Sequence, residues 1–281
     1  MTTKTFITYV TTWGKDPLAL ITDMISKNAL TSNTIIILAF ASFNFNTSTY
    51  IPGFNITIDE VKQIVSLVHS HNSKILLSIG GATYPFAGSD LYSRPGDLAN
   101  NINQILITCG FDGADFDIED SYSNVPADFA NNAASLINTL KNLNQNLYLS
   151  LTTAAQAWSQ GCYQLQLINW TIGNLNAYQP MEYDIWIDPS SNYTNQILWD
   201  LNFYINTWGI VPNKIVLGLM PGYDDMQHNL QLSDALNLTS QAKQLGLEGV
   251  MTWDLDIDSD GVDGNAPYAY TMGIQSILFN N

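Results

Sequence analysis

Eight strand-like apolar runs alternate with helix-like segments along the chain, and this alternation is the strongest constraint on its fold. Strands that alternate with helices form parallel sheets whose faces are covered by those helices. The pattern therefore predicts an α/β fold, either a closed (β/α)8 barrel or an open doubly wound sheet. The predicted strands are Thr5–Thr12, Thr34–Phe43, Lys74–Gly80, Gly110–Glu119, Leu147–Thr153, Ala177–Ile187, Lys214–Met220 and Gly249–Leu255.

The segments between these runs have the periodicity of amphipathic helices. Apolar residues recur at helical spacing in residues 57–70, 126–143 and 232–245. Thr57 followed three residues later by Glu60 is typical of a capping box at a helix start. We therefore expect helices over these three segments.

Polar and aromatic residues recur at the ends of the predicted strands. A (β/α)8 barrel gathers the carboxyl ends of its strands at one mouth, where such barrels place their active sites. This favours the barrel over the doubly wound sheet, as one domain over residues 1–281. Residues 221–248 have room for one loop and one helix, so no inserted α+β domain is expected. The residues at the strand ends are Trp13, Asn44, Gly81, Glu119, Gln156, Asp184, Tyr223 and Asp254.

The charge balance excludes some classes of partner. The chain has 9 Lys and Arg against 25 Asp and Glu, which gives a net charge of −16. Such a surface repels nucleic acid phosphates and anionic membranes. No apolar run approaches the roughly 18–20 residues that a membrane span needs. Only 12% of the residues are charged, and an uncharged polar surface suits neutral sugar chains.

The run from Asp112 to Glu119 places carboxylates Asp115, Asp117 and Glu119 at alternate positions. On a strand, alternate side chains share one face and lie about 6.5–7 Å apart. Like charges in a partly desolvated place raise the pKa of one another. A metal site and a solvated face are the alternatives, and apolar neighbours such as Phe116 argue against the solvated face. The run is best interpreted as a catalytic carboxylate set.

Four motifs in order give the chain a resemblance to glycoside hydrolase family 18, the chitinases and their relatives. The resemblance extends over nearly the whole chain. Each motif alone is weak, and the four together on successive predicted strands are specific. The motifs are Ser78-Ile79-Gly80-Gly81 on the third strand, Asp112, Asp115, Asp117 and Glu119 on the fourth, Met181-Glu182-Tyr183-Asp184 on the sixth and Trp253 on the eighth.

The resemblance implies a retaining mechanism in which the 2-acetamido group of the substrate is the nucleophile. Glu119 would then protonate the glycosidic oxygen and later activate water. Asp117 would accept a hydrogen bond from the acetamide N–H, and Asp115 would share a proton with Asp117. Tyr183 would donate to the acetamide oxygen.

The resemblance also implies a set of substrate-binding residues. Trp253 would form an apolar floor under the sugar, Asp184 would bind a sugar hydroxyl or the acid residue, and Met181 would pack under the acetamide methyl. Tyr9 and Phe40 match aromatic positions lining the floor of the family's barrel. Gly81, with Gly80, would allow a tight turn beside the site. Core packing is the alternative for the aromatic residues and for Met181. Further aromatic residues near strand ends, each able either to stack on a sugar or to pack in the core, are Trp13, Tyr84, Phe86, Trp158, Trp186 and Tyr223.

Two further features leave alternatives open. Asp256, Asp258 and Asp260 match the first half of a calcium loop, but Pro267 stands where the closing Glu is required. We expect no cofactor or metal and keep calcium as the alternative to an acidic loop beside the mouth. Cys109 and Cys162 are expected to be buried thiols, with a disulfide as the alternative.

The leading functional hypothesis is endo-acting, retaining hydrolysis of β-1,4-linked N-acetylglucosamine polymers. The alternatives are an endo-β-N-acetylglucosaminidase acting on N-glycan cores and an inactive sugar-binding barrel. Expected partners are chitin or N-acetylglucosamine oligosaccharides, bound by a monomer. An extracellular location is expected, although residues 1–4 lead into a strand without a signal-peptide core, which calls for a removed leader or another export route.

Overall fold

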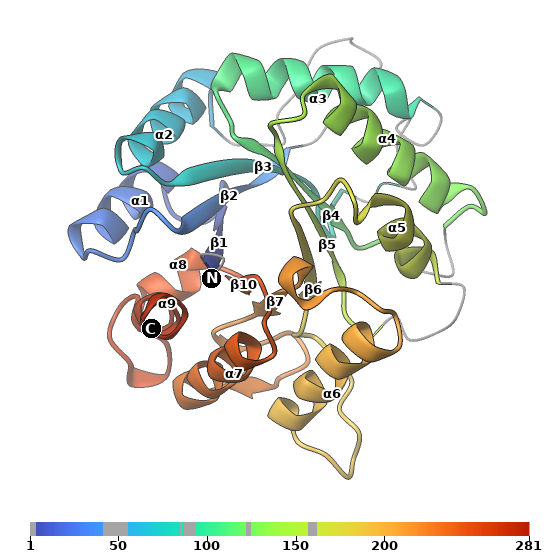
Figure 1. Ribbon diagram of the computed structural model, residues 1–281. Helices are drawn as coiled ribbons and strands as arrows, with labels where there is room; N and C mark the ends of the chain where they lie inside the picture. Colours follow the sequence, from blue (N-terminus) through green and yellow to red (C-terminus); the bar gives the residue numbers. More distant parts are fainter. Residues whose placement is uncertain are drawn as a thin grey trace.

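The computed structural model describes residues 4–41, 56–84, 86, 94–121, 125–156 and 162–280. Its parallel strands close into a barrel in the order β1-β10-β7-β6-β5-β4-β3-β2 (Figure 1). The predicted (β/α)8 barrel is therefore confirmed, and the doubly wound sheet is excluded. The barrel strands are β1 (Thr5–Thr11), β2 (Thr34–Ala41), β3 (Lys74–Gly80), β4 (Gly113–Ile118), β5 (Tyr148–Ala154), β6 (Ala177–Met181), β7 (Val216–Leu219) and β10 (Gly249–Thr252).

Helices surround the barrel (Figure 1). The capping box predicted at Thr57 is present, because the Thr57 hydroxyl accepts from the Glu60 N–H and the Glu60 carboxylate accepts from the Thr57 N–H. The helices are α1 (Pro17–Ser26), α2 (Ile58–Ser70), α3 (Pro95–Cys109), α4 (Phe129–Leu143), α5 (Tyr163–Thr171), α6 (Tyr193–Asn206), α7 (Leu232–Gln244), α8 (Leu255–Ser259) and α9 (Ala269–Phe279).

Several predicted strands are too long, among them the seventh and the eighth, and the bounds of the fourth and the sixth differ most. Residues 110–112 do not belong to β4, because Gly110 has a φ of +84° and ends helix α3. The sixth strand ends at Met181 and not at Ile187, and Asp184 has a φ of +54°, which no extended strand accepts. The predicted end of the second strand, Phe43, lies outside the described residues.

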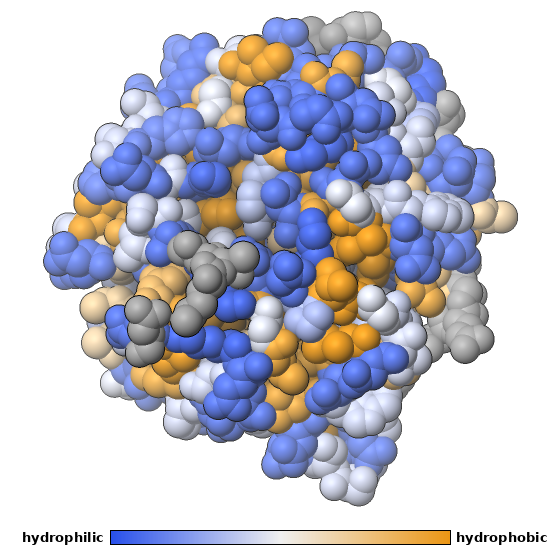
Figure 2. Space-filling view, in the orientation of Figure 1, coloured by the Kyte–Doolittle hydropathy of each residue, from blue (hydrophilic) through white to orange (hydrophobic). Residues whose placement is uncertain are grey.

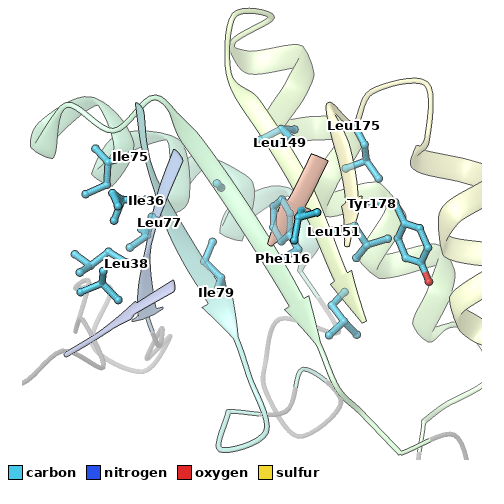
Figure 3. Packing of buried hydrophobic residues seen from close by; sticks show 14 of the residues in the cluster. Ile36, Leu38, Ile75, Leu77, Ile79, Phe116, Leu149, Leu151, Leu175 and Tyr178 are labelled. Atoms are coloured by element: carbon cyan, nitrogen blue, oxygen red, sulfur yellow. The ribbon is translucent and has the colours of Figure 1, made fainter. Parts of the chain in front are cut away.

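The strands pack on both faces. Side chains that face outward, such as Ile36, Leu77, Phe116 and Leu151, form a large core with the helices (Figure 3). Because side chains alternate along a strand, the neighbours of Phe116 on β4 face the barrel interior. The interior holds a smaller apolar cluster that includes Tyr9, Phe40, Met181, Tyr183 and Met251. The two carboxylates of β4 thus share the barrel interior with this cluster.

A short hairpin, β8 (Gly222–Tyr223) and β9 (Asn229–Leu230), follows β7 and precedes helix α7. Residues 221–248 contain this hairpin and α7 but no further domain, as predicted. Hydrophilic residues cover much of the face shown in Figure 2, with hydrophobic residues between them. Among the described residues, no helix combines the length and the apolar character needed to span a bilayer.

Candidate active site

The carboxyl groups of Asp115, Asp117 and Glu119 form a ladder that rises along β4. Asp115 pairs in register with Ser78 of β3, and Asp117 pairs with Gly80 at the end of β3. Asp115 and Asp117 are buried, whereas Glu119 follows the strand and is partly exposed. The structure therefore brings together the three carboxylates predicted from their spacing, from the barrel interior to its mouth.

Asp115 is the centre of a hydrogen-bond network in the barrel interior. Burial raises the pKa of Asp115, and the hydroxyl donors around its carboxyl group lower that pKa. Five donors from four strands satisfy both oxygens, an arrangement that stabilises the ionised form. The donors are the Tyr9 hydroxyl at 2.8 Å and the Ser78 hydroxyl at 2.7 Å on Oδ2, and the Ser150 hydroxyl at 2.7 Å, the Thr152 hydroxyl at 2.9 Å and the Gln179 amide at 3.1 Å on Oδ1.

Asp117 has a different environment two residues further along the same strand. Its side chain is equally buried, but its Oδ1 has no hydrogen-bond partner within the described residues. Burial raises the pKa of Asp117 well above its ordinary value, and the charges of Glu119 and Asp115 raise it further. The pKa of Asp117 is raised more strongly than that of Asp115, and we therefore assign the proton to Asp117 and the negative charge to Asp115.

Glu119 is the carboxyl group nearest to solvent. Burial raises its pKa, the backbone N–H of Ala82 lowers it, and the charges of Asp184 and Asp120 raise it. The next residue, Asp120, is held in place by two hydrogen bonds. Its Oδ2 accepts from the Phe86 N–H at 3.0 Å, and its carbonyl accepts from the Tyr163 hydroxyl at 2.7 Å. A raised pKa and a fixed backbone suit a general acid.

Gly80 and Gly81 let β3 approach the carboxylates closely. Their φ values are +111° and +81°. A Cβ at Gly80 would lie 2.1 Å from the Asp117 carbonyl oxygen, and a Cβ at Gly81 would lie 2.5 Å from the Phe40 ring. The Gly81 N–H also donates to the Asp117 carbonyl at 2.9 Å. Both positions therefore require glycine, and the predicted turn beside the site is present.

Tyr183 and Met181 come from the end of β6 and belong to the apolar cluster inside the barrel. Burial raises the pKa of Tyr183 well above its ordinary value, and the carboxylates of Asp117 and Glu119 raise it further. The phenol therefore stays protonated and lies close enough to these groups to interact with them. It is a neutral hydrogen-bond donor beside the two upper carboxyls.

An aromatic wall, defined here as Trp13, Phe40 and Trp253, runs from the barrel interior to solvent. The Phe40 ring stacks on Trp253 with centroids 5.8 Å apart and on Trp13 with centroids 5.7 Å apart. Tyr9 contacts Trp253 with centroids 5.2 Å apart. Trp13 is 51% exposed, and Trp253 is partly exposed. The wall offers flat apolar faces of the kind on which pyranose C–H groups pack.

The other predicted stacking residues differ in exposure. Tyr84, Trp186 and Tyr223 are exposed and stay candidates for stacking on sugars. Phe86 is only 3% exposed, so it is a packing residue. Trp158 lies outside the described residues.

Asp184 lies at the mouth but is engaged by the protein itself. Its Oδ1 accepts from the backbone N–H of Asp225 at 2.6 Å and of Met226 at 3.3 Å. Its own N–H donates to Asp224 Oδ2 at 2.8 Å. Asp184 therefore ties the end of β6 to the β8–β9 hairpin, which the sequence did not predict.

The calcium alternative does not fit the structure. Asp256 and Asp258 lie in helix α8, and Asp258 accepts from the N–H groups of Tyr270 and Thr271 at the start of α9. Asp260 instead pairs with Lys15 at 2.6 Å. Asp256 also accepts from the Lys15 N–H, so all three carboxylates are bound by other groups of the protein. The described residues contain no group of three side chains placed to hold a metal.

Cys109 and Cys162 are buried thiols that form no disulfide, so the disulfide alternative is wrong. Burial raises the pKa of both thiols. A shallow groove of about 370 Å³ lies between α4 and α5, two of the helices that surround the barrel. It lacks titratable side chains, so it does not compete with the barrel interior as a catalytic site. Its lining residues are Asn131, Ala134, Ser135, Asn138 and Trp170.

Sequence reasoning missed several polar residues of the barrel. Ser150, Thr152 and Gln179 reach Asp115 from β5 and β6, and their alternate placement along each strand was the available signal. Glu182 is fully buried on the other side of the chain from Tyr183. Burial raises the pKa of Glu182 well above its ordinary value, and Asp200 on α6 raises it further.

Comparison with known proteins agrees with the family resemblance that the sequence motifs indicated. The family model "Glycosyl hydrolases family 18" matches residues 5–231. The chain is 29% identical to "Chitinase D" of Niallia circulans over 150 residues, which are 49% of this chain but only 28% of that protein's length. The chain thus matches less than a third of this relative.

Solved structures share the fold at lower sequence identity. A family 18 chitinase from Pseudoalteromonas aurantia has a TM-score of 0.76 and 18% identity, with 97% of this chain and 99% of that chain covered. Human YKL-39, described as a pseudo-chitinase with retained chitooligosaccharide binding properties, has a TM-score of 0.73 and 17% identity, with 99% and 100% covered. The fold is therefore common to an enzyme and to a pseudo-enzyme, and the activity has to be argued from the site.

Proposed function

This chain belongs to family 18 of the glycosyl hydrolases, and we propose that it hydrolyses β-1,4 linkages between N-acetylglucosamine units with retention of configuration. The observation that carries the proposal is the carboxylate ladder. Glu119 is a carboxyl of raised pKa near solvent, above a buried Asp117 that holds a proton and a buried Asp115 that holds a charge. A pseudo-chitinase requires no such complete acid site, so the ladder favours an enzyme.

The chemistry follows from the position of each group. Glu119 would give its proton to the glycosidic oxygen while the acetamide carbonyl oxygen of the substrate attacks C1 from the opposite face, and the C1–O bond to the leaving sugar breaks. Water then attacks C1 and gives a proton back to Glu119, which restores the acid and the acetamide. Two displacements at C1 leave the β configuration unchanged.

Neighbouring residues would orient the acetamide and stabilise its charge. The unpartnered oxygen of Asp117 would accept from the acetamide N–H, and the Tyr183 hydroxyl would donate to its carbonyl oxygen. The Asp115 anion lies beneath the cationic intermediate and stabilises it electrostatically. Met181 and Trp253 supply apolar contacts to the acetamide methyl and to the sugar face.

We propose endo cleavage because the mouth has no inserted domain between β7 and β10 to close the cleft over a chain end. A polymer too large to enter a cell has to be cleaved outside it, so we propose an extracellular location. Residues 1–281 would act as one catalytic domain and as a monomer, without a cofactor.

The test compares the wild type with Glu119→Gln on chitohexaose. Loss of a positioned acid lowers the rate by roughly 10²–10⁴-fold. Because glutamine preserves size and polarity, the melting temperature and the affinity for the hexamer should be retained. A rate within about tenfold of the wild type would contradict the role of Glu119.

A product profile separates the rival functions. We expect chitin oligomers to be cleaved internally, with the β-anomer as the first product, and a high-mannose glycopeptide to be left intact. Cleavage of the glycopeptide alone would identify an endo-β-N-acetylglucosaminidase. Binding of the hexamer without cleavage by the wild type would identify an inactive sugar-binding barrel.

A further inference from the structure

Trp13 lies in a short loop that one carboxylate holds at both ends. Asp256 Oδ2 accepts from the Thr11 hydroxyl at 3.1 Å, and Asp256 Oδ1 accepts from the Lys15 backbone N–H at 2.8 Å. Thr11 and Lys15 flank Trp13 at two residues' distance on either side. Asp256 itself is anchored in α8, at the far end of the sequence. The carboxylate that joins the two ends of the loop thus comes from a distant part of the chain.

Gly14, the neighbour of Trp13, shows how closely the loop packs against this carboxylate. A Cβ at Gly14 would lie 2.6 Å from Asp256 Oδ1 and 2.8 Å from the Thr11 hydroxyl. Real side chains do not tolerate such distances, so the backbone at Gly14 rests directly on the carboxylate. The loop conformation is thereby narrowly defined.

The Lys15 ammonium adds a second set of contacts to α8. It donates to the Asp256 carbonyl at 3.1 Å, to the Ser259 hydroxyl at 2.5 Å and to Asp260 Oδ1 at 2.6 Å. The side chains of Lys15 and Asp260 are 40% and 75% exposed, and such surface ion pairs contribute little. The Asp256 carboxylate, bonded to a backbone N–H and a partly buried hydroxyl, is the dominant contact.

We propose that Asp256 is a positioning residue that holds Trp13 in the aromatic wall. It thereby increases the affinity for long substrates, whose sugars extend past those next to the cleaved bond. Trp13 is half exposed, yet it stacks on Phe40. If the Trp13 side chain became ordered only when substrate binds, the entropy cost of ordering it would lower the affinity for that substrate. Asp256 orders the loop in advance. The inference rests on the proposed function, since it assigns sugars to the aromatic wall.

The experiment measures kcat and KM of Asp256→Ala on chitohexaose and on the shortest chitooligosaccharide that the wild type cleaves. We expect KM for the hexamer to rise three- to tenfold with kcat retained, and KM for the short substrate to stay unchanged. Trp13→Ala should give the same pattern with a larger rise. The double variant should be no worse than Trp13→Ala, because Asp256 acts through Trp13.

Two further variants keep the test sharp. Asp256→Asn retains one acceptor and should recover part of the affinity. It also allows the test to be made if Asp256→Ala does not fold. Asp260→Ala removes an equal charge from the same segment and should leave both KM values within twofold of the wild type. A parallel loss of kcat on both substrates, or additive effects in the double variant, would overturn the inference. Absence of cleavage by the wild type would instead refute the proposed function.

Discussion

Two isosteric substitutions on β4, Asp115→Asn and Asp117→Asn, should differ in their effect on stability, with a large loss in the first and almost none in the second. The residues lie two positions apart, face the same interior and are both buried. Asp115 is the charged member with a full set of donors, whereas Asp117 is protonated and has an unpartnered oxygen. At pH 7, Asp115→Asn removes a buried anion from its donors, and Asp117→Asn replaces a neutral acid by a neutral amide.

The hydrogen bonds give the size of the difference. A hydrogen bond to a charged group stabilises a protein by about 1.5–3 kcal/mol, and a neutral one by about 0.5–1.5 kcal/mol. The Asp115 carboxylate accepts five such bonds. The amide nitrogen of an asparagine accepts nothing, so with this nitrogen in place of Oδ2 the Ser78 hydroxyl would lose its acceptor, while Tyr9 keeps Thr152 at 2.9 Å. Asp115→Asn also removes the free-energy cost of burying a charge, so we expect a net loss of stability of about 2–4 kcal/mol.

Thermal unfolding at pH 7 measures this prediction. At about 2–4 °C per kcal/mol for a chain of this size, Asp115→Asn should lower the melting temperature by roughly 4–16 °C. Asp117→Asn should stay within about 2 °C of the wild type. Both variants should lose activity, so activity alone does not separate them. Equal losses of stability, or a greater loss in Asp117→Asn, would refute our assignment of the charge to Asp115.

Two further predictions concern a buried acid and a glycine. Burial raises the pKa of Glu182, so the folded chain keeps a proton that the unfolded chain releases as the pH rises above about 4.3, and stability falls with rising pH. Glu182→Gln should therefore match the wild type in melting temperature near pH 4 and exceed it at pH 8, and parallel pH profiles would contradict this. Gly80→Ala should cost at least about 3 kcal/mol, because its Cβ would meet the Asp117 carbonyl at 2.1 Å, whereas Gly96→Ala, with no atom within 4 Å, should leave the melting temperature unchanged or raised. Equal melting temperatures in these two alanine variants would show that β3 can move away from β4.

The sequence predicted the parts of the molecule that depend on local periodicity. Alternation along a strand has a period of two, so the common face of Asp115, Asp117 and Glu119 was readable from their spacing alone. The capping box at Thr57 is likewise a local feature. Eightfold repetition then predicted closure, because polar strand ends have a common location only in a barrel.

The errors in strand bounds, and the calcium alternative that the sequence left open, arose where residues distant in sequence decide the structure. The apolar run after Ala177 reads as one long strand, yet the chain leaves the barrel at Met181 and turns at Asp184, which binds the β8–β9 hairpin about forty residues away. The acidic motif after Trp253 matches half of a calcium loop in residue types and spacing. Its carboxylates instead bind Lys15, at the other end of the chain, and the start of α9.

The distribution of charge on β4 bears on the choice of nucleophile. A retaining glycosidase with an enzyme nucleophile needs an ionised carboxylate about 5–5.5 Å from its acid. Burial and the neighbouring charges raise the pKa of Asp117 and so favour its protonated form, and Asp115 is bound by its hydroxyl and amide donors. Asp184 is tied through one oxygen to the β8–β9 hairpin. None of these three carboxyls is both ionised and free of protein partners, which supports our proposal that the nucleophile comes from the 2-acetamido group of the substrate.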